Sequence, residues 1–142
     1  MALFSKDRVL VPIDFSEASL LALKEALAFV ESNANLHALN VISRREATEP
    51  GVVWDTLDDE TRKQNVEKAL HERLAGTDHE GMQFTVAIGD PSAEIIDYAK
   101  THQIQLIVMP SRGRTGLERF FLGSVTDRVI RFAHCPVLVI RD

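Results

Sequence analysis

The chain has 142 residues, of which 45% are hydrophobic and 26% are charged, and its formal net charge is −5 at pH 7. This composition is typical of one globular domain with a buried core, and the acidic balance argues against general nucleic-acid binding. No apolar stretch approaches the roughly 20 residues that cross a bilayer, and the first eight residues lack the apolar segment of a signal peptide. We therefore expect a single cytoplasmic domain over residues 1–142, with no membrane partner.

Short apolar segments alternate along the chain with segments of helical periodicity. Ser16 and Asp90 each precede a helical pattern and are suited to cap it, and Pro91 suits the first helical position. Residues 43–56 show no periodicity and predict a loop. The predicted strands cover residues 8–13, 36–42, 82–88, 105–109 and 136–140, and the predicted helices begin at Ser16, cover 58–74, begin at Pro91 and cover 124–132.

This order of elements predicts an α/β fold in three layers, with a five-stranded, mostly parallel sheet between two layers of helices. Residues 9–13, 106–109 and 137–140 are continuously apolar, as is typical of parallel strands buried on both faces. We expect the strand order 3-2-1-4-5, with the more alternating residues 82–88 at an edge. No internal repeat or second domain is evident.

The segment of residues 107–126 carries most of the functional information. An apolar run ends at Met109, a loop rich in glycine and arginine follows, and Gly123-Ser124 opens a helix. Glycine lets a backbone approach a ligand closely, and the free N–H groups of a helix N-terminus favour an anion. Phosphate is the anion that this combination favours. The loop contributes Gly113, Gly116, Arg112, Arg114 and Arg119, and the arginines could either neutralise phosphate or be solvated.

The expected topology places this loop opposite a carboxylate. With the order 3-2-1-4-5, the strand order reverses between the first and the fourth strand, and ligands of open α/β sheets bind beyond the carboxyl ends of the strands at such a point. Asp14 follows the first strand, so it could bind a ribose hydroxyl, a base amine or a metal ion, or it could cap the first helix together with Ser16. Ser124 could donate to a phosphate or act as a helix cap.

These segments resemble the universal stress protein family. Its nucleotide-binding members carry a glycine, two residues, a second glycine, nine residues, and then Gly-Ser or Gly-Thr. Gly113 and Gly123-Ser124 match the second and third elements of this pattern. The resemblance also includes residues 11–16, 39–42 and 135–141, and therefore spans nearly the whole chain.

The resemblance implies a Rossmann-like fold of the adenine nucleotide α-hydrolase type, and an adenine nucleotide such as ATP, ADP or AMP, with or without magnesium, as ligand. It implies a regulatory role in the stress response and a homodimer formed through the last strand, at Val137, Leu138, Val139 and Ile140. The adenine and ribose would lie against Pro12, Ile13, Asp14 and Val41, and the ribose and phosphates against Met109, Arg112, Gly113, Gly123, Ser124 and Val125.

Pro110 departs from the family pattern, because it stands where the first glycine is expected. Proline has no N–H group and its φ angle is fixed near −65°. A hydrogen bond lost to a charged group is worth about 1.5–3 kcal/mol, which is roughly a 10- to 150-fold loss of affinity. The sequence therefore leaves open a second function, a dimeric partner-binding stress protein that binds no nucleotide.

Other functions lack their required residues. The chain has no Walker A lysine, no dinucleotide fingerprint after the first strand and no Gly-x-Ser-x-Gly elbow. Gly113 to Gly116 matches the short loop of nucleic-acid-binding KH domains, but the alternating strands and helices argue against them. A response-regulator receiver would need an acidic pair where Asp14 stands alone.

The remaining reactive side chains do not form a recognisable catalytic or metal-binding pattern. Cys135 is the single cysteine, and we expect a small buried or half-buried thiol and not a reactive one. The histidines have no metal-ligand spacing, and we expect no protein-bound metal beyond one that a nucleotide brings to Asp14. Asp14 is the one candidate base near the expected phosphates, so we expect at most a slow ATPase. The histidines are His37, His71, His79, His102 and His134.

Overall fold

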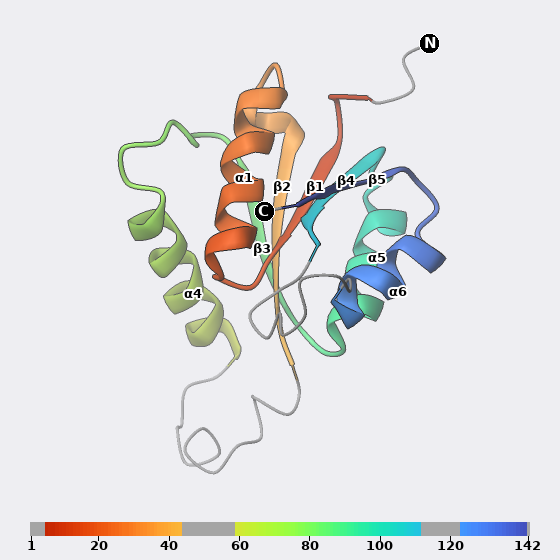
Figure 1. The fold of residues 1–142 in the computed structure, drawn as a ribbon. Coiled ribbons are helices and arrows are strands. Elements are labelled where there is room, and N and C mark those ends of the chain that lie inside the picture. The colour runs from red at the N-terminus through yellow and green to blue at the C-terminus, as the bar shows by residue number, and fades with distance from the viewer. Residues whose placement is uncertain (1–4, 44–58, 112–122, 142) are drawn as a thin grey trace.

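The computed structural model describes residues 5–43, 59–111 and 123–141. Five strands and the helices between them follow the predicted order (Figure 1). The strands are β1 (Val9–Ile13), β2 (Leu36–Ile42), β3 (Gln83–Ile88), β4 (Leu106–Pro110) and β5 (Val137–Ile140). The helices are α1 (Glu17–Phe29), α4 (Asp59–Arg73), α5 (Pro91–Thr101) and α6 (Ser124–Phe132), and a short 3-10 helix (Asn33–Asn35) precedes β2.

The strands form one sheet in the order β3-β2-β1-β4-β5, and all four neighbouring pairs are parallel. The predicted three-layer α/β fold and strand order are therefore confirmed. The predicted edge position of β3 is confirmed as well, and β5 forms the other edge. The loop expected at residues 43–56 lies outside the described residues except for Ser43.

Helices cover both faces of the sheet, with α1 and α4 on one side and α5 and α6 on the other (Figure 1). Successive side chains of β1 enter opposite cores, because side chains of a strand alternate between the two faces. Val9 and Val11 pack with Leu23 of α1 and Leu70 of α4, whereas Leu10 packs with the α5 and α6 side. Burial on both faces explains why the central strands are apolar without interruption.

The predicted capping residues begin their helices. The Ser16 hydroxyl accepts from the Ser19 N–H at 3.1 Å at the start of α1. Asp90 accepts from the Ala93 N–H at 3.0 Å and from the Ser92 hydroxyl at 2.9 Å, and Pro91 is the first residue of α5. The Ala93 hydrogen bond, followed by that of Ser92, lowers the pKa of the Asp90 carboxyl.

None of the helices within the described ranges is long and apolar enough to cross a membrane.

A buried histidine lies beneath α5 near the start of β2. His37 is 6% exposed, and its Nδ1 lies 2.7 Å from the hydroxyl of Tyr98. The Gln83 side-chain amide lies 3.4 Å from its Nε2, so a neutral His37 that carries its proton on Nδ1 donates to Tyr98 and accepts from Gln83. Burial lowers the pKa of His37, and the nearby His102 and Arg8 lower it further.

The lowered pKa of His37 makes stability depend on pH. As pH falls below about 6.5, the unfolded chain takes up a proton at His37 that the native state resists, so the free energy of unfolding decreases. In His37→Gln, we expect the slope of this free energy between pH 6.5 and 5 to be smaller by up to about 1.4 kcal/mol per pH unit. Urea unfolding at several pH values measures it.

The exposed His134 provides the matched control, because His134→Gln removes a histidine without changing the buried one. The slope of His37→Gln should be the smaller of the two. Equal slopes for the wild type and His37→Gln would contradict the role assigned to His37.

Candidate functional site

The sheet is open between β1 and β4. These strands are in register only at Val9 with Leu106 and Leu10 with Ile107, although β1 continues to Ile13 and β4 to Pro110. By contrast, β2 pairs with β1 over the full length of β1. The carboxyl halves of β1 and β4 therefore part at the position where the strand order reverses, which is where open α/β sheets bind ligands.

A pocket of about 520 Å³ lies at this opening. Its volume falls within the range of about 300–1,000 Å³ that is usual for small-molecule sites. Val66 of α4, Pro91 of α5 and the first residues of α6 contribute to its walls. Of the predicted nucleotide-binding residues, those in the described ranges all line it: Pro12, Ile13, Asp14, Val41, Met109, Gly123, Ser124 and Val125. Arg112 and Gly113 lie outside the described residues, so their place in the site stays a prediction.

Asp14 is half-buried at the end of β1, and its environment is polar. Its carboxylate accepts from the Ser16 N–H at 3.0 Å, and its own N–H donates to the Ser19 hydroxyl at 3.3 Å. Ser19, which is buried, in turn donates to the Ser16 carbonyl at 3.0 Å. Ser16, and not Asp14, is the cap residue of α1, whereas Asp14 orders the turn before the helix and lines the pocket, so its role in ligand binding stays a prediction.

Phe15, next to Asp14, has a left-handed backbone with a φ of 63°. This conformation is uncommon for residues other than glycine and costs about 1 kcal/mol or more. The Phe15 side chain packs against the core beneath α1, which compensates for the strain. The turn therefore reverses sharply after β1 and leaves Asp14 at the pocket wall.

The carbonyls at the ends of the parting strands accept hydrogen bonds from buried side chains. The Asn40 amide of β2 donates to the Ile13 carbonyl at 2.8 Å, and the Thr126 hydroxyl of α6 donates to the Pro110 carbonyl at 2.9 Å. Asn40 is 7% and Thr126 is 3% exposed. These hydrogen bonds tie the end of β1 to β2 and the end of β4 to α6.

The N-terminus of α6 faces the pocket. Gly123 is the cap residue, contributes no side-chain hydrogen bond to the helix, and donates its N–H to the Ser111 carbonyl at 2.7 Å. Ser124 is therefore the first helical residue and is exposed, rather than the cap that was one of its two expected roles. Because a helix begins with N–H groups that have no helical partner, this end of α6 is suited to an anion.

The pocket contains few groups for chemistry. Asp14 is the single titratable side chain among its described lining residues. No group of three or more His, Cys, Asp or Glu side chains within the described ranges could hold a metal ion. Cys135 lies away from this pocket, and burial raises the pKa of its thiol, so it is a weak nucleophile. The arrangement is suited to binding a ligand with an anionic end and an apolar end.

Comparison with known proteins decides the family. Residues 6–141 match the model of the universal stress protein family. The chain belongs to the universal stress protein family. The universal stress protein MJ0531 of Methanocaldococcus jannaschii is 34% identical over 143 residues, which cover 94% of this chain and 81% of that protein.

Solved structures of the family share the fold. The protein MJ0577 of the same organism superposes with a TM-score of 0.78 at 28% identity and covers 99% of this chain and 98% of its own. A universal stress protein solved in complex with cAMP has a TM-score of 0.63 over 98% of each chain, and its 17% identity shows a common fold alone. The family resemblance of the sequence is thus confirmed.

Several residues that shape the pocket were not predicted from the sequence. Asn40, Ser19 and Thr126 hold the strand ends and the turn after β1, and Val66 and Pro91 complete the walls. The signal for Asn40 is a polar residue between Leu39 and Val41 in a strand that is largely apolar. Thr126 lies one position beyond the last predicted residue, Val125, and its role follows only from the packing of α6 against β4.

The bond from Thr126 to Pro110 gives a prediction about stability. Thr126→Val keeps the shape of the side chain but removes the donor, so we expect a loss of about 1–2 kcal/mol in the free energy of unfolding. Thr126→Ser keeps the hydroxyl and should restore much of the hydrogen-bond contribution. Urea unfolding measures both variants, and a Thr126→Val protein as stable as the wild type would contradict the role of this bond.

Proposed function

We propose that this universal stress protein binds an adenine nucleotide, such as ATP, ADP or AMP, in the pocket between β1 and β4, and that it acts as a regulatory module of the stress response. The observation that carries the proposal is the placement of Asp14 and the N-terminus of α6 around one pocket of suitable volume. A nucleotide has the matching chemistry, because it joins an anionic phosphate group and a polar ribose to a largely apolar base.

The phosphates belong at the start of α6. The N–H groups of Ser124 and Val125 are among those that the helix leaves without a partner in its first turn, and both residues line the pocket. The helix dipole adds attraction for an anion at this end. The phosphate oxygens would accept hydrogen bonds from these N–H groups without replacing any hydrogen bond within the helix.

The ribose and base belong at the end of β1 and β2. The Asp14 carboxylate is an acceptor for ribose hydroxyls, or a ligand for magnesium that arrives with the nucleotide. Val41 and Ile42 offer apolar surface on one side of the pocket, and Pro91 offers it on another. A universal stress protein of the same fold has been solved in complex with cAMP, so the fold itself is compatible with an adenine nucleotide.

The site is better suited to regulation by nucleotide binding than to nucleotide hydrolysis. Hydrolysis needs groups that position a water molecule and stabilise the transition state, and Asp14 is alone among the described lining residues in being titratable. We therefore propose occupancy of the pocket as the signal, with hydrolysis slow if it takes place.

Calorimetry with ATP, ADP and AMP, with and without magnesium, tests nucleotide binding directly. No heat of binding at about 1 mM nucleotide would contradict the proposal.

A negative charge introduced at the start of α6 should affect nucleotide affinity and folding stability differently. In Ser124→Asp, the new carboxylate suits the positive end of the helix, so stability should be unchanged or slightly higher. The same carboxylate repels phosphates, so we expect nucleotide affinity to fall at least about tenfold. Thermal unfolding and calorimetry give the two readouts.

Two matched variants complete this test. Ser124→Ala removes the hydroxyl without adding charge and should weaken binding much less. Gln105→Glu adds the same charge at an exposed position before β4, at the opposite end of the sheet, and should leave affinity unchanged. Equal nucleotide affinity in Ser124→Asp and the wild type would refute the phosphate position.

A specific observation also favours a partner-binding role through β5. This strand is at the edge of the sheet, and its Leu138 is 44% exposed, while Ile130 and Phe132 of the preceding α6 are 42% and 62% exposed. Edge strands present unpaired backbone groups that a second strand can bind. We propose that β5, at Val137, Leu138, Val139 and Ile140, forms a homodimer with its counterpart in a second chain, whether or not nucleotide binds.

The chain supplies two exposed leucines for testing the dimer. Leu138→Lys should convert the dimer into a monomer, because it places like charges at the proposed interface. Leu21→Lys changes an equally exposed leucine on α1, which is 46% exposed, and should leave the dimer intact. Analytical ultracentrifugation distinguishes the outcomes, and a wild-type monomer at high concentration would contradict the dimer.

A further inference from the structure

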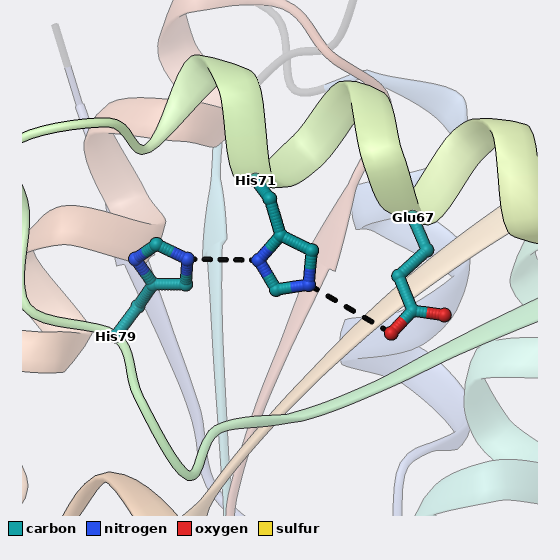
Figure 2. Close-up of polar contacts among 3 residues, drawn as sticks. All are labelled: Glu67, His71 and His79. Carbon is teal, nitrogen blue, oxygen red and sulfur yellow. Dashed lines mark hydrogen bonds and ion pairs between the residues drawn. The ribbon is translucent and has the colours of Figure 1, made fainter.

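Two histidines that do not line the pocket between β1 and β4 lie side by side near the end of α4 (Figure 2). His71 is in the last turn of the helix, and the chain reverses directly after it. Gly76 adopts a φ of +85°, which is unfavourable for other residues, and the Thr77 N–H donates to the Leu74 carbonyl at 2.9 Å. This tight turn returns His79 to the side of His71, although eight positions separate them.

The two imidazoles meet through one nitrogen each. Nδ1 of His71 lies 2.9 Å from Nε2 of His79, and the ring planes are 28° apart with centroids separated by 5.0 Å. The rings therefore meet at their edges rather than face to face, as Figure 2 shows. Two lone pairs at this distance repel each other, so a hydrogen between the two nitrogens is needed in the absence of a metal ion.

Each outer nitrogen faces a hydrogen-bond acceptor. Nδ1 of His79 lies 2.8 Å from the Thr77 carbonyl oxygen, and a carbonyl only accepts, so this nitrogen carries a proton. Nε2 of His71 lies 3.7 Å from Oε1 of Glu67, one helical turn earlier (Figure 2). Metal-binding histidines usually donate their second N–H to a backbone carbonyl or a carboxylate, which directs the lone pair of the other nitrogen to the metal.

We propose that His71 and His79 form a binding site for a divalent transition-metal ion such as Zn²⁺. Nδ1 of His71 and Nε2 of His79 are the protein ligands, and water completes the coordination. In a neutral pair, the proton between the rings moves from Nδ1 to Nε2 of His71, and the new N–H group faces the Glu67 carboxylate as its acceptor. Both inner lone pairs are then available to the metal. Imidazole nitrogen suits zinc, copper and nickel, whereas magnesium and calcium prefer oxygen.

Metal binding requires a small increase in the separation of the two nitrogens and a rotation of the rings that aims both lone pairs at the metal. Zinc–nitrogen bonds of about 2.0–2.1 Å in tetrahedral geometry need the two nitrogens about 3.3 Å apart, compared with 2.9 Å here. The side chain of His71 is 51% exposed, which leaves room for the ring to turn and for water ligands. The bound metal would join the end of α4 to the turn that precedes β3.

Titration of tag-free, metal-free protein with Zn²⁺ or Ni²⁺ tests the site. We expect one equivalent to bind in calorimetry and to raise the melting temperature by about 5–10 °C at a metal concentration 100-fold above Kd. His71→Ala and His79→Ala should each weaken binding by more than about tenfold, because even the loss of an outer partner usually costs that much. Mg²⁺ and Ca²⁺ should produce neither effect.

Further variants distinguish this site from others on the surface. His134→Ala removes an exposed histidine beside Cys135 and should bind the metal as the wild type does. Glu67→Ala should weaken binding less than the loss of either histidine, because Glu67 orients a ligand and is not one itself. Absence of Zn²⁺ and Ni²⁺ binding at millimolar concentration would overturn the proposal. Binding that survives in both His71→Ala and His79→Ala would overturn it as well.

Discussion

The parting of β1 and β4 is the constraint on which the rest of the site depends. The two strands pair at their amino ends and separate after Leu10 and Ile107. A sheet that is buried on both faces therefore contains an opening between two inner strands, at their carboxyl ends. Backbone groups at such an opening require partners, since a buried group without a hydrogen bond is costly. Asn40 and Thr126 supply them for the Ile13 and Pro110 carbonyls, and all four residues line the pocket.

The turn after β1 and the start of α6 complete the site from opposite sides. Asp14 is ordered by Ser16 and Ser19, and its position requires the left-handed backbone of Phe15. On the other side, the packing of Thr126 on Pro110 aims the first turn of α6 towards the pocket. Pro110 thus has a structural part as the acceptor at the end of β4, although it supplies no N–H group to a ligand.

The fold was predictable because its determinants are local and repeated. Continuous apolar segments identified the buried strands, and Ser16, Asp90 and Pro91 identified the helix starts that the structure confirms. The supports of the site were less accessible, because Asn40 and Thr126 act across 27 and 16 positions of sequence. The meeting of His71 and His79 was missed for a similar reason, since it depends on the tight reversal at Gly76 and not on a known ligand spacing.

The central claim, that an adenine nucleotide occupies the opening between β1 and β4, is tested most directly by the amide spectrum of ¹⁵N-labelled protein during titration with AMP. With the nucleotide in this pocket, the signals of Asp14, Val41 and Val125 move together and saturate, while those at the opposite end of the sheet, such as Gln105, stay in place. No movement at millimolar AMP, or movement confined to residues outside the pocket, would contradict it.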